Sequence, residues 1–377
     1  MQKSLSVAAA TFIFSTVASA QGSVTLYGVL DEGLNFTNNA GGAKAYQMST
    51  ADLGVSRFGL KGSEELGGGL HGIFQLDNGF DINNGRLSYG GRLFGYNAYV
   101  GLQSDALGSL TLGRQFDSIT DVLGPLTANG NWAGTLFSHP LDNDNTDATF
   151  HIDNAVKYTS GTYGGFSATA MYGFSNQAGG FALNRAVTAG IKYTYDTLTV
   201  GAVYANLSSP GASRTGALTT DDAGFVAGNQ KIYGIGANYG FGPATLGLVY
   251  THTNVSRPAS SIWVGDLGTS NGSSKFDNFE GNVKYDISPA FSVGGMYTYT
   301  RARVSSGGGA SSIHWNEGGV MASYSLSKRT VLYAQAVYQK VSGATGTVLD
   351  NAFIVGSAGV SSNSHQVVSR VAMMHTF

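Results

Sequence analysis

Apolar and polar side chains alternate with a period of two along several segments of the chain. Between residues 186 and 196, every second residue is apolar: Val187, Ala189, Ile191, Tyr193 and Tyr195. Successive side chains of a β-strand point to opposite faces, whereas a helix would scatter the two sets around its axis. The pattern therefore predicts a strand with one apolar and one hydrophilic face.

A second segment, 279–287, shows the same alternation with stronger polarity. Its hydrophilic positions are Glu280, Asn282, Lys284 and Asp286. A dry core would not accept four such residues in a row, so this face is expected to meet water while the other meets lipid. Segments 245–252 and 291–300 repeat the pattern.

The connections between these segments alternate between short and long. The short ones are 104–109, 160–165, 196–197, 240–243, 288–290 and 327–330, and the long ones are 117–149, 208–228, 255–275 and 342–365. Short periplasmic turns and longer external loops are typical of outer-membrane barrels. Because unpaired backbone groups are costly in hydrocarbon, the sheet must close. We therefore predict an all-β, transmembrane antiparallel barrel of about sixteen strands around an aqueous lumen.

The N-terminus has the features of an export signal. Lys3 precedes an apolar stretch, and Ala18-Ser19-Ala20 offers the small residues that signal peptidase needs. Residues 1–20 are expected to be removed, which leaves 21–377 as a single barrel domain. No later apolar run is long enough for a membrane helix.

Composition narrows the classes further. The 377 residues include 21 Lys and Arg against 23 Asp and Glu, so there is no broad basic field for nucleic acid. Only 12% of residues are charged, while Gly (55), Tyr (20) and Phe (20) are abundant, which suits lipid-facing strands with tight turns. Cysteine is absent and the histidines are scattered, so no disulfide framework, metal site or cofactor is expected.

Several motifs resemble those of the Gram-negative general porins, particularly the betaproteobacterial group. They are QGSVTLYG at 21–28, SRFGLKGSEELG at 56–67, AYVGL at 98–102, LGRQ at 112–115, NAVKY at 154–158 and the terminal Phe377. The resemblance implies a homotrimer of sixteen-stranded barrels in the outer membrane, in contact with lipid and lipopolysaccharide. It also implies that the third external loop, about 117–149, folds into the lumen, and that Phe377 is read by the barrel-assembly machinery.

In the resembled family, arginines on the wall face carboxylates on the inward loop. Arg57 matches the first wall arginine, and Lys61 shares its face by pleat parity. Tyr96 stands where relatives often place an arginine, and His151 stands where they often open the sixth strand with one. The positive cluster is therefore thinner here. A histidine gains a positive charge below about pH 6.5. Two alternatives therefore remain for His151: it makes the conductance pH-dependent, or it is an inert residue of the lumen.

Two further cations could compensate for this loss. Arg92 would share a side with Tyr96 in a regular strand, although a rim position in an external loop is an equal alternative. Lys157 shares a face with His151. Arg114 begins the inward loop and could pair with one of its carboxylates or anchor the strand end.

On the loop side, Asp117 and Asp121 are the acidic candidates for the constriction, with Asn131 and Trp132 following them. The later aspartates, Asp142, Asp144 and Asp147, are expected to solvate the end of the loop. Charges lining a narrow pore bias ion passage, and the thinned cluster predicts only weak charge selectivity.

The predicted function is passive diffusion of ions and small hydrophilic solutes through an outer-membrane porin. One alternative is a substrate-specific channel, for example for sugars, with Trp132, Tyr96 and Phe137 as a stacking path. Another is a barrel enzyme, because Ser138, His139, Asp142 and Asp144 are catalytic residue types in one loop, although a triad is recognised by geometry. A secreted β-solenoid or adhesin would need a short repeat, which is not seen.

Overall fold

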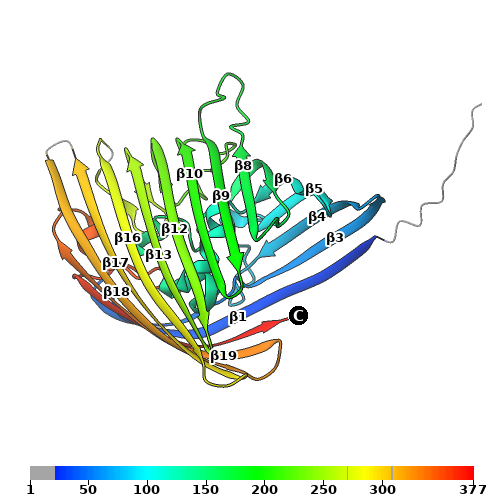
Figure 1. Cartoon of the computed structure of the whole chain (residues 1–377). Helices are drawn as coiled ribbons and strands as arrows, with labels where there is room; N and C mark the ends of the chain where they lie inside the picture. Colours follow the sequence, from blue (N-terminus) through cyan, green and yellow to red (C-terminus); the bar gives the residue numbers. More distant parts are fainter. Residues whose placement is uncertain (1–21, 270, 307–308) are drawn as a thin grey trace, which may run out of the picture.

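The computed structural model describes residues 22–269, 271–306 and 309–377; the predicted signal peptide, 1–20, lies outside these ranges. The described residues form an antiparallel β-barrel, whose long strands are visible in Figure 1. No helix within these ranges is long and apolar enough to span a bilayer. The strands of the barrel are β1 (Ser23–Ala40), β2 (Ala43–Thr50), β3 (Arg57–Gly67), β4 (Leu70–Gly79), β5 (Asn97–Ser104), β6 (Gly108–Gln115), β7 (Ile152–Thr159), β8 (Phe166–Gly173), β9 (Arg185–Tyr195), β10 (Leu198–Ser208), β12 (Asn229–Phe241), β13 (Ala244–Ser256), β16 (Ser273–Asp286), β17 (Phe291–Ser306), β18 (Gly309–Ser325), β19 (Thr330–Gly343) and β20 (His365–Thr376).

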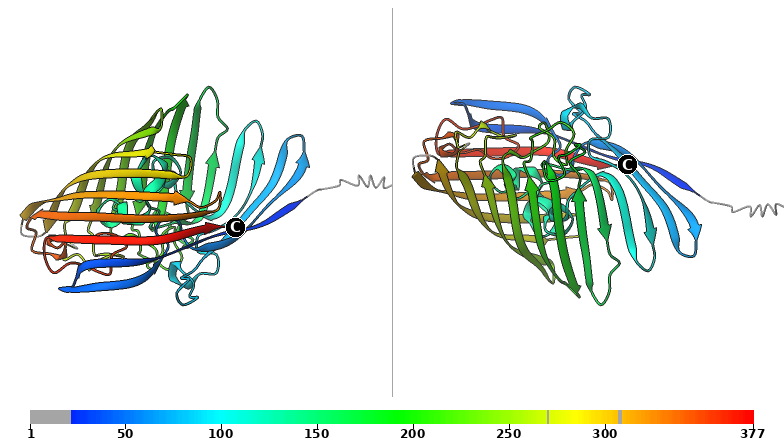
Figure 2. Two further views of the ribbon diagram at one scale, coloured as in Figure 1. Left: turned by 90° about the horizontal axis from the view of Figure 1, so that it is seen from below. Right: turned by 90° about the horizontal axis from the view of Figure 1, so that it is seen from above.

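The barrel closes on β1. The first half of β1 pairs with β3, from Ser23 opposite Ser63 to Val29 opposite Arg57, and its second half pairs with β2. Because β2 and β3 follow one another along one edge of β1, the seventeen strands of the sheet fill sixteen positions. The other edge of β1 pairs with β20, and the left view in Figure 2 shows β20, in red, lying beside β1, in blue. The predicted closed barrel of sixteen strands is confirmed.

The connections alternate in length as the sequence predicts. The short turns are 68–69, 105–107, 160–165, 196–197, 242–243, 287–290 and 326–329, and the longer loops at the opposite end include 80–96, 116–151, 174–184, 209–228, 257–272 and 344–364. The first hairpin is an exception at the long-loop end, because only Gly41 and Gly42 join β1 to β2. Both have positive φ, 61° and 98°, which glycine adopts without strain. Three two-residue strands, β11 (Phe225–Val226), β14 (Ser260–Ser261) and β15 (Gly265–Asp266), form a small sheet within the loops.

The two faces of the strands differ in the way that the period of two predicts. In β13, Leu246 and Leu248 are 50% and 71% exposed, whereas Thr251 and Thr253 on the opposite face are fully buried. The exposed apolar side chains cover the outside of the barrel, where hydrocarbon would surround them. The inward face carries most of the polar side chains.

Segment 116–151 packs against the inward faces of several strands. It contains α1 (Ser118–Val122), η2 (Gly124–Leu126), η3 (Asn129–Ala133), η4 (Thr135–Phe137) and η5 (Pro140–Asp142). Glycines in the wall make room for it: a Cβ added at Gly294 would lie 2.5 Å from the ring of Trp132, and one at Gly319 would lie 2.4 Å from the ring of Phe137. Side chains at these two positions would push the segment away from the wall.

Other loops cover the wall at the long-loop end. Phe225, Leu267 and Phe353 from three loops join Phe276 of β16 and Trp315 of β18 in one buried apolar cluster. The inward faces of β13 and β16–β19 are thus largely covered by loops. A polar cavity of about 440 Å³ lies on the other side, along β3–β7.

Candidate pore constriction

Two polar cavities meet beside the N-terminal half of the barrel wall. The strand cavity, about 440 Å³, lies against β3–β7, and the loop cavity, about 280 Å³, lies between residues 52–57 and segment 116–151. Arg57, Tyr96 and Phe116 line both cavities. A solute moving from one cavity to the other would therefore pass these three side chains.

Arg57 is the basic group at this junction. As the first residue of β3, it is held by a hydrogen bond from Nη1 to the carbonyl of Val55, 3.0 Å, and its guanidinium carbon lies 4.7 Å from the ring centroid of Tyr96. Such stacking orients a cation without neutralising it. Lys61 lies four residues beyond Arg57 on the same face of β3, and its ammonium group is 5.0 Å from the ring centroid of Tyr27. The ring of Tyr96 thus supports the guanidinium of Arg57 at the junction.

Lys157 and Asp121 form an ion pair where α1 meets β7. Lys157 also donates to the carbonyl of Phe116, 2.9 Å. Both charged residues line the strand cavity. Because each neutralises the other at close range, Lys157 adds little net positive charge to the cavity.

Asp117 is placed differently from the sequence hypothesis. Its carboxylate is fully buried and caps α1 by accepting hydrogen bonds from the backbone N–H groups of Ile119 and Thr120, at 2.9 and 3.0 Å. Asn145 donates to its second oxygen. These contacts make Asp117 a structural cap, so of the two acidic candidates the structure brings only Asp121 to the cavity.

Arg92 and Arg114 hold loops together at the external end. Arg92 lies in loop 80–96 and pairs with Asp221, 3.1 Å, so it takes the rim position. Arg114 is 7% exposed and pairs with Asp153 and Asp222, both at 2.6 Å. The structure does not bring either arginine into the lining of the two cavities.

Asn131 and Trp132 also lie outside the junction. Asn131 is exposed and lines a third cavity of about 370 Å³ near the 287–290 turn. Trp132 is 7% exposed, packs against Phe137, and donates from its indole to Asn282, 3.4 Å. Its ring is used mainly to attach the segment to the wall.

The expectation for the later aspartates is wrong for Asp142 and Asp144, whereas Asp147 is partly exposed and lines the loop cavity. Asp142 and Asp144 are 2% and 0% exposed, and both carboxylates accept hydrogen bonds inside the protein. Asp144 contacts Nδ1 of His139 at 2.6 Å, and the Nε2 of the same ring contacts Glu280 of β16 at 3.0 Å. Segment 116–151 covers this stretch of wall, so Glu280, which was expected to face water, is 3% exposed. At Glu280 and Asn282, protein groups rather than bulk water satisfy this polar face, whereas Lys284 and Asp286 nearer the turn are 35% and 54% exposed at their side chains, as predicted.

His151 is fully buried among aromatic rings. Its ring centroid lies 4.9 Å from Tyr89, 5.4 Å from Tyr96 and 4.5 Å from Phe116. Burial, and then the positive charges of Arg114 and Arg92, lower the pKa of His151 well below its usual range. The ring is therefore neutral near neutral pH.

We expect that replacing His151 with Gln leaves the pH profile of conductance between pH 7.5 and 5.5 unchanged. Because the folded-state pKa is depressed, only the unfolded chain takes up the proton near pH 6.5. Acid would thus lower the stability that the neutral ring provides, without charging the pore. Conductance of the wild type and His151→Gln across this range tests the point. A step near pH 6.5 that disappears in the variant would contradict it.

The strand cavity also contains a polar network that was not predicted from the sequence. Gln75 donates to the hydroxyl of Tyr27, 2.9 Å, and to Asp77, 2.7 Å, while Asn97 donates to Asp77 and Tyr99 donates to Gln75. The signal was available, because Gln75 and Asp77 alternate with Phe74 and Leu76 in β4. The network places the carboxylate of Asp77 on the wall of the strand cavity, which Arg57 also lines.

The same geometry bears on the two alternative functions. Ser138 donates to the carbonyl of Thr135, 2.7 Å, and both ring nitrogens of His139 contact carboxylates, so these two residues do not form a nucleophile and base pair. Phe137 is fully buried against the wall and is not available for a stacking path. In the described ranges, no group of three or more His, Asp or Glu side chains is arranged to hold a metal ion.

The closed barrel, its apolar outer face and its polar inner cavities define an outer-membrane channel protein. The family model described as Gram-negative porin matches residues 4–344. An outer-membrane porin of Bordetella pertussis is 30% identical, over 90% of this chain and 94% of the relative. The chain belongs to the Gram-negative porin family, whose members are channels rather than enzymes.

Other relatives and solved structures are also similar to this chain. Outer membrane porin protein 32 of Delftia acidovorans is 28% identical over the whole of both chains. The solved anion-selective porin from Comamonas acidovorans has a TM-score of 0.73 at 22% identity, covering 95% of this chain and all of that one. The trimer form of OmpT from Vibrio cholerae has a TM-score of 0.64 at 16% identity, covering 94% and 99%. These likenesses confirm the barrel fold, and together with the family they place the protein in the outer membrane.

Proposed function

We propose that ions and small hydrophilic solutes cross this porin along the inward faces of β3–β7, and that segment 116–151 narrows their path beside Arg57. The observation that carries the proposal is that the strand and loop cavities meet at Arg57, Tyr96 and Phe116. Wall residues line one side of the loop cavity and Gly124, Pro125 and other residues of segment 116–151 line the other. Most of the side chains that line the two cavities offer charge or hydrogen bonds, which suits the passive diffusion of hydrophilic solutes.

The proposed selectivity is weak, with a contribution toward anions from Arg57 and Lys61. Lys157 is neutralised by Asp121, and Asp77 adds an opposing charge on the wall. The similar Comamonas structure is an anion-selective porin. Because Asp77 on the wall and Asp147 in the loop cavity oppose Arg57, the expected preference for anions is small, since selectivity follows the few charges that line the narrowest path.

The functional unit that we propose is a homotrimer in the outer membrane, in contact with phospholipid and lipopolysaccharide. The trimer form of a similar structure supports this assembly. Phe377 would serve as the signal for the barrel-assembly machinery. Its backbone exchanges two hydrogen bonds of 3.0 Å with Gly28, which brings the last residue onto the closing strand.

Replacing Arg57 with Ala should shift the anion-to-cation permeability ratio about fivefold toward cations. One unit charge about 5 Å from a passing ion contributes about 0.5 kcal/mol in 0.1 M salt, attractive for an anion and repulsive for a cation, so the ratio changes by about 1 kcal/mol. Reversal potentials in planar bilayers under a salt gradient measure the ratio. Arg301→Ala is a matched control, because that arginine is 61% exposed at its side chain and pairs with Asp277 on the outer face.

The two possible failures can be separated. Unchanged conductance and selectivity in Arg57→Ala would remove Arg57 from the path while leaving the channel itself intact. A wild-type protein that inserts into the bilayer but passes no ions would overturn the proposed channel function.

A further inference from the structure

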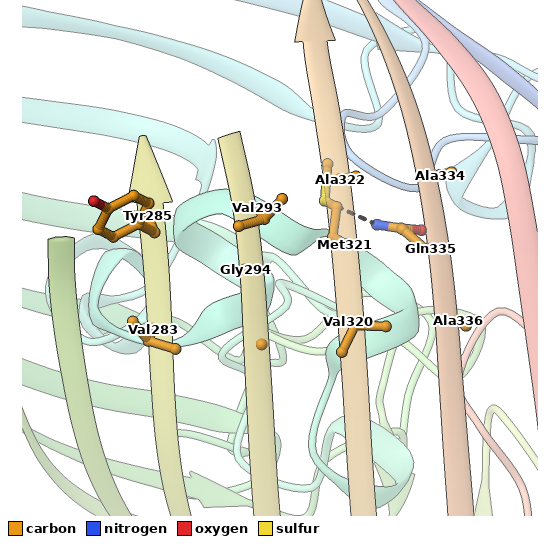
Figure 3. A pocket seen from close by; sticks show the side chains of 11 residues that line it. Val283, Tyr285, Val293, Gly294, Val320, Met321, Ala322, Ala334, Gln335 and Ala336 are labelled. Carbon is orange, nitrogen blue, oxygen red and sulfur yellow. Dashed lines mark hydrogen bonds between the residues drawn. The ribbon is translucent and has the colours of Figure 1, made fainter. Parts of the chain in front are cut away.

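The outer wall of the barrel carries an apolar groove across four strands. The groove has a volume of about 590 Å³ and is lined by side chains of β16, β17, β18 and β19. Figure 3 shows it with Tyr285 and Val283 on one side and Ala334 and Ala336 on the other. It is the largest of the cavities described, and the pore does not use it.

Small residues at outward positions create the groove. Gly295 lies opposite Val320, which in turn lies opposite Ala336, and Ala322 lies opposite Ala334 in the next row. A Cβ at Gly295 would find its nearest neighbour only at 3.8 Å, so the space above it is open. Larger outward side chains beside this strip leave a depression.

The floor of the groove is well supported from inside. Gly294, next to Gly295, lies against the ring of Trp132, and Gln335 donates to the sulfur of Met321, 3.5 Å. Behind the strands in Figure 3 runs the ribbon of segment 116–151. The groove is therefore a feature of a packed wall rather than a gap between strands.

A basic turn lies at the end of the same strands. Lys328 and Arg329 lie in the 326–329 turn between β18 and β19, and both are exposed. They are the only basic residues in the seven short turns 68–69, 105–107, 160–165, 196–197, 242–243, 287–290 and 326–329. The single positive turn thus occurs at the end of the two strands that hold most of the groove.

The distance between turn and groove fits one lipid molecule. Ala334 follows Arg329 by five residues, which is about 17 Å along a strand. With the tilt usual for barrel strands, this becomes about 12 Å of height, within one leaflet of a hydrocarbon core about 30 Å thick. Between them, Thr330 and His375 are hydrogen-bonded to each other at 2.9 Å and offer polar atoms at headgroup level.

We propose that this groove binds an acyl chain of a phospholipid in the periplasmic leaflet, and that Lys328 and Arg329 hold its anionic headgroup. The charge of the turn selects an anionic lipid over a zwitterionic one, since each basic residue near the surface contributes to that attraction. The inference rests on the barrel's place in the outer membrane and not on the path of solutes. Lipid binding and conductance can therefore fail independently.

Titration of the purified trimer in detergent with dioleoyl phosphatidylglycerol, followed by native mass spectrometry, tests the proposal. Phosphatidylethanolamine with the same acyl chains is the comparison. The wild type should bind phosphatidylglycerol more tightly, and Lys328→Gln with Arg329→Gln should weaken that binding about 25-fold, or about fivefold per charge. Lys44→Gln, at the opposite end of the barrel, is the charge control.

Filling the groove tests the acyl site separately. Ala336→Phe should reduce the binding of both lipids, whereas Ala170→Phe, an exposed position on β8 outside the groove, should not. Ala334→Leu is the milder variant if Ala336→Phe does not fold, and heat-modifiable gel migration reports folding. Equal binding of the two lipids by the wild type, or groove and turn variants that behave like their controls, would overturn the proposal. Loss of the trimer in Ala336→Phe with lipid binding retained would also overturn it, because the groove would then be a subunit contact.

Discussion

Replacing Arg370 with Met should lower the free energy of unfolding of the barrel by about 3–5 kcal/mol, because it leaves buried carboxylates without their countercharge. Arg370 is 1% exposed and donates to Asp31 on β1, 2.9 Å, and to the hydroxyl of Tyr333 on β19, 2.9 Å. It also donates to Asn35 and to the carbonyl of Ser49 on β2. This one side chain therefore joins four strands at the point where the barrel closes.

Urea unfolding in lipid vesicles, followed by tryptophan fluorescence, measures the loss. Arg301→Met is the control, since its exposed ion pair with Asp277 should contribute no more than about 1 kcal/mol. Arg370→Lys should lie between the wild type and Arg370→Met, because the charge remains while most of the hydrogen bonds are lost. If Arg370→Met were as stable as Arg301→Met, Arg370 would not stabilise the barrel where β20 closes on β1.

Replacing His139 with Ala should release segment 116–151 from the wall. The ring lies between Asp144 of the segment and Glu280 of β16, and all three side chains are essentially buried. Removing the ring leaves two buried carboxylates without their partner. Breaking a buried ion pair in this way lowers the free energy of unfolding by about 3–5 kcal/mol. We expect faster proteolytic cleavage within 116–151 and greater noise in the open-channel current, with Asn131→Ala, an exposed site in the same segment, as the control.

The attachment through His139 should also depend on pH. Burial by itself would lower the pKa of His139, but the carboxylates of Asp144 and Glu280 outweigh it and raise the pKa well above its usual value of 6.5. The stability from the charged ring is thus fully present below about pH 6.5 and is lost as the pH rises through the folded-state pKa. Proteolysis of the wild type and His139→Gln should differ most at pH 6 and converge in alkaline solution. A difference that grows with pH would contradict this assignment.

The regular part of the barrel could be predicted because its cause is local. Each strand must present apolar side chains to lipid on alternate positions, so residues such as Leu246 and Leu248 report their face without knowledge of their neighbours. Turn lengths likewise depend on a few adjacent residues. The division of one strand position into β2 and β3 was not predicted, because it depends on which part of β1 each segment meets.

The site was harder to predict because burial and pairing depend on residues distant in the chain. Arg57 lies at the junction of two cavities, but Lys157 is balanced by Asp121 and Arg114 by Asp222, 108 residues away. Asp117 is a helix cap rather than a pore carboxylate. In each case the residue type was informative, while its partner determined whether its charge is available.

The amino-acid sequence by itself determined that this chain is a membrane barrel of about sixteen strands, because the exclusion of unpaired backbone from lipid and the two-solvent alternation act along every strand. Only the tertiary structure decided which charges stay free. Burial and Coulomb attraction act between groups that the fold brings together, such as His139 with Glu280 and Arg370 with Asp31. These contacts join residues that are distant in the chain, so no local sequence pattern predicts them.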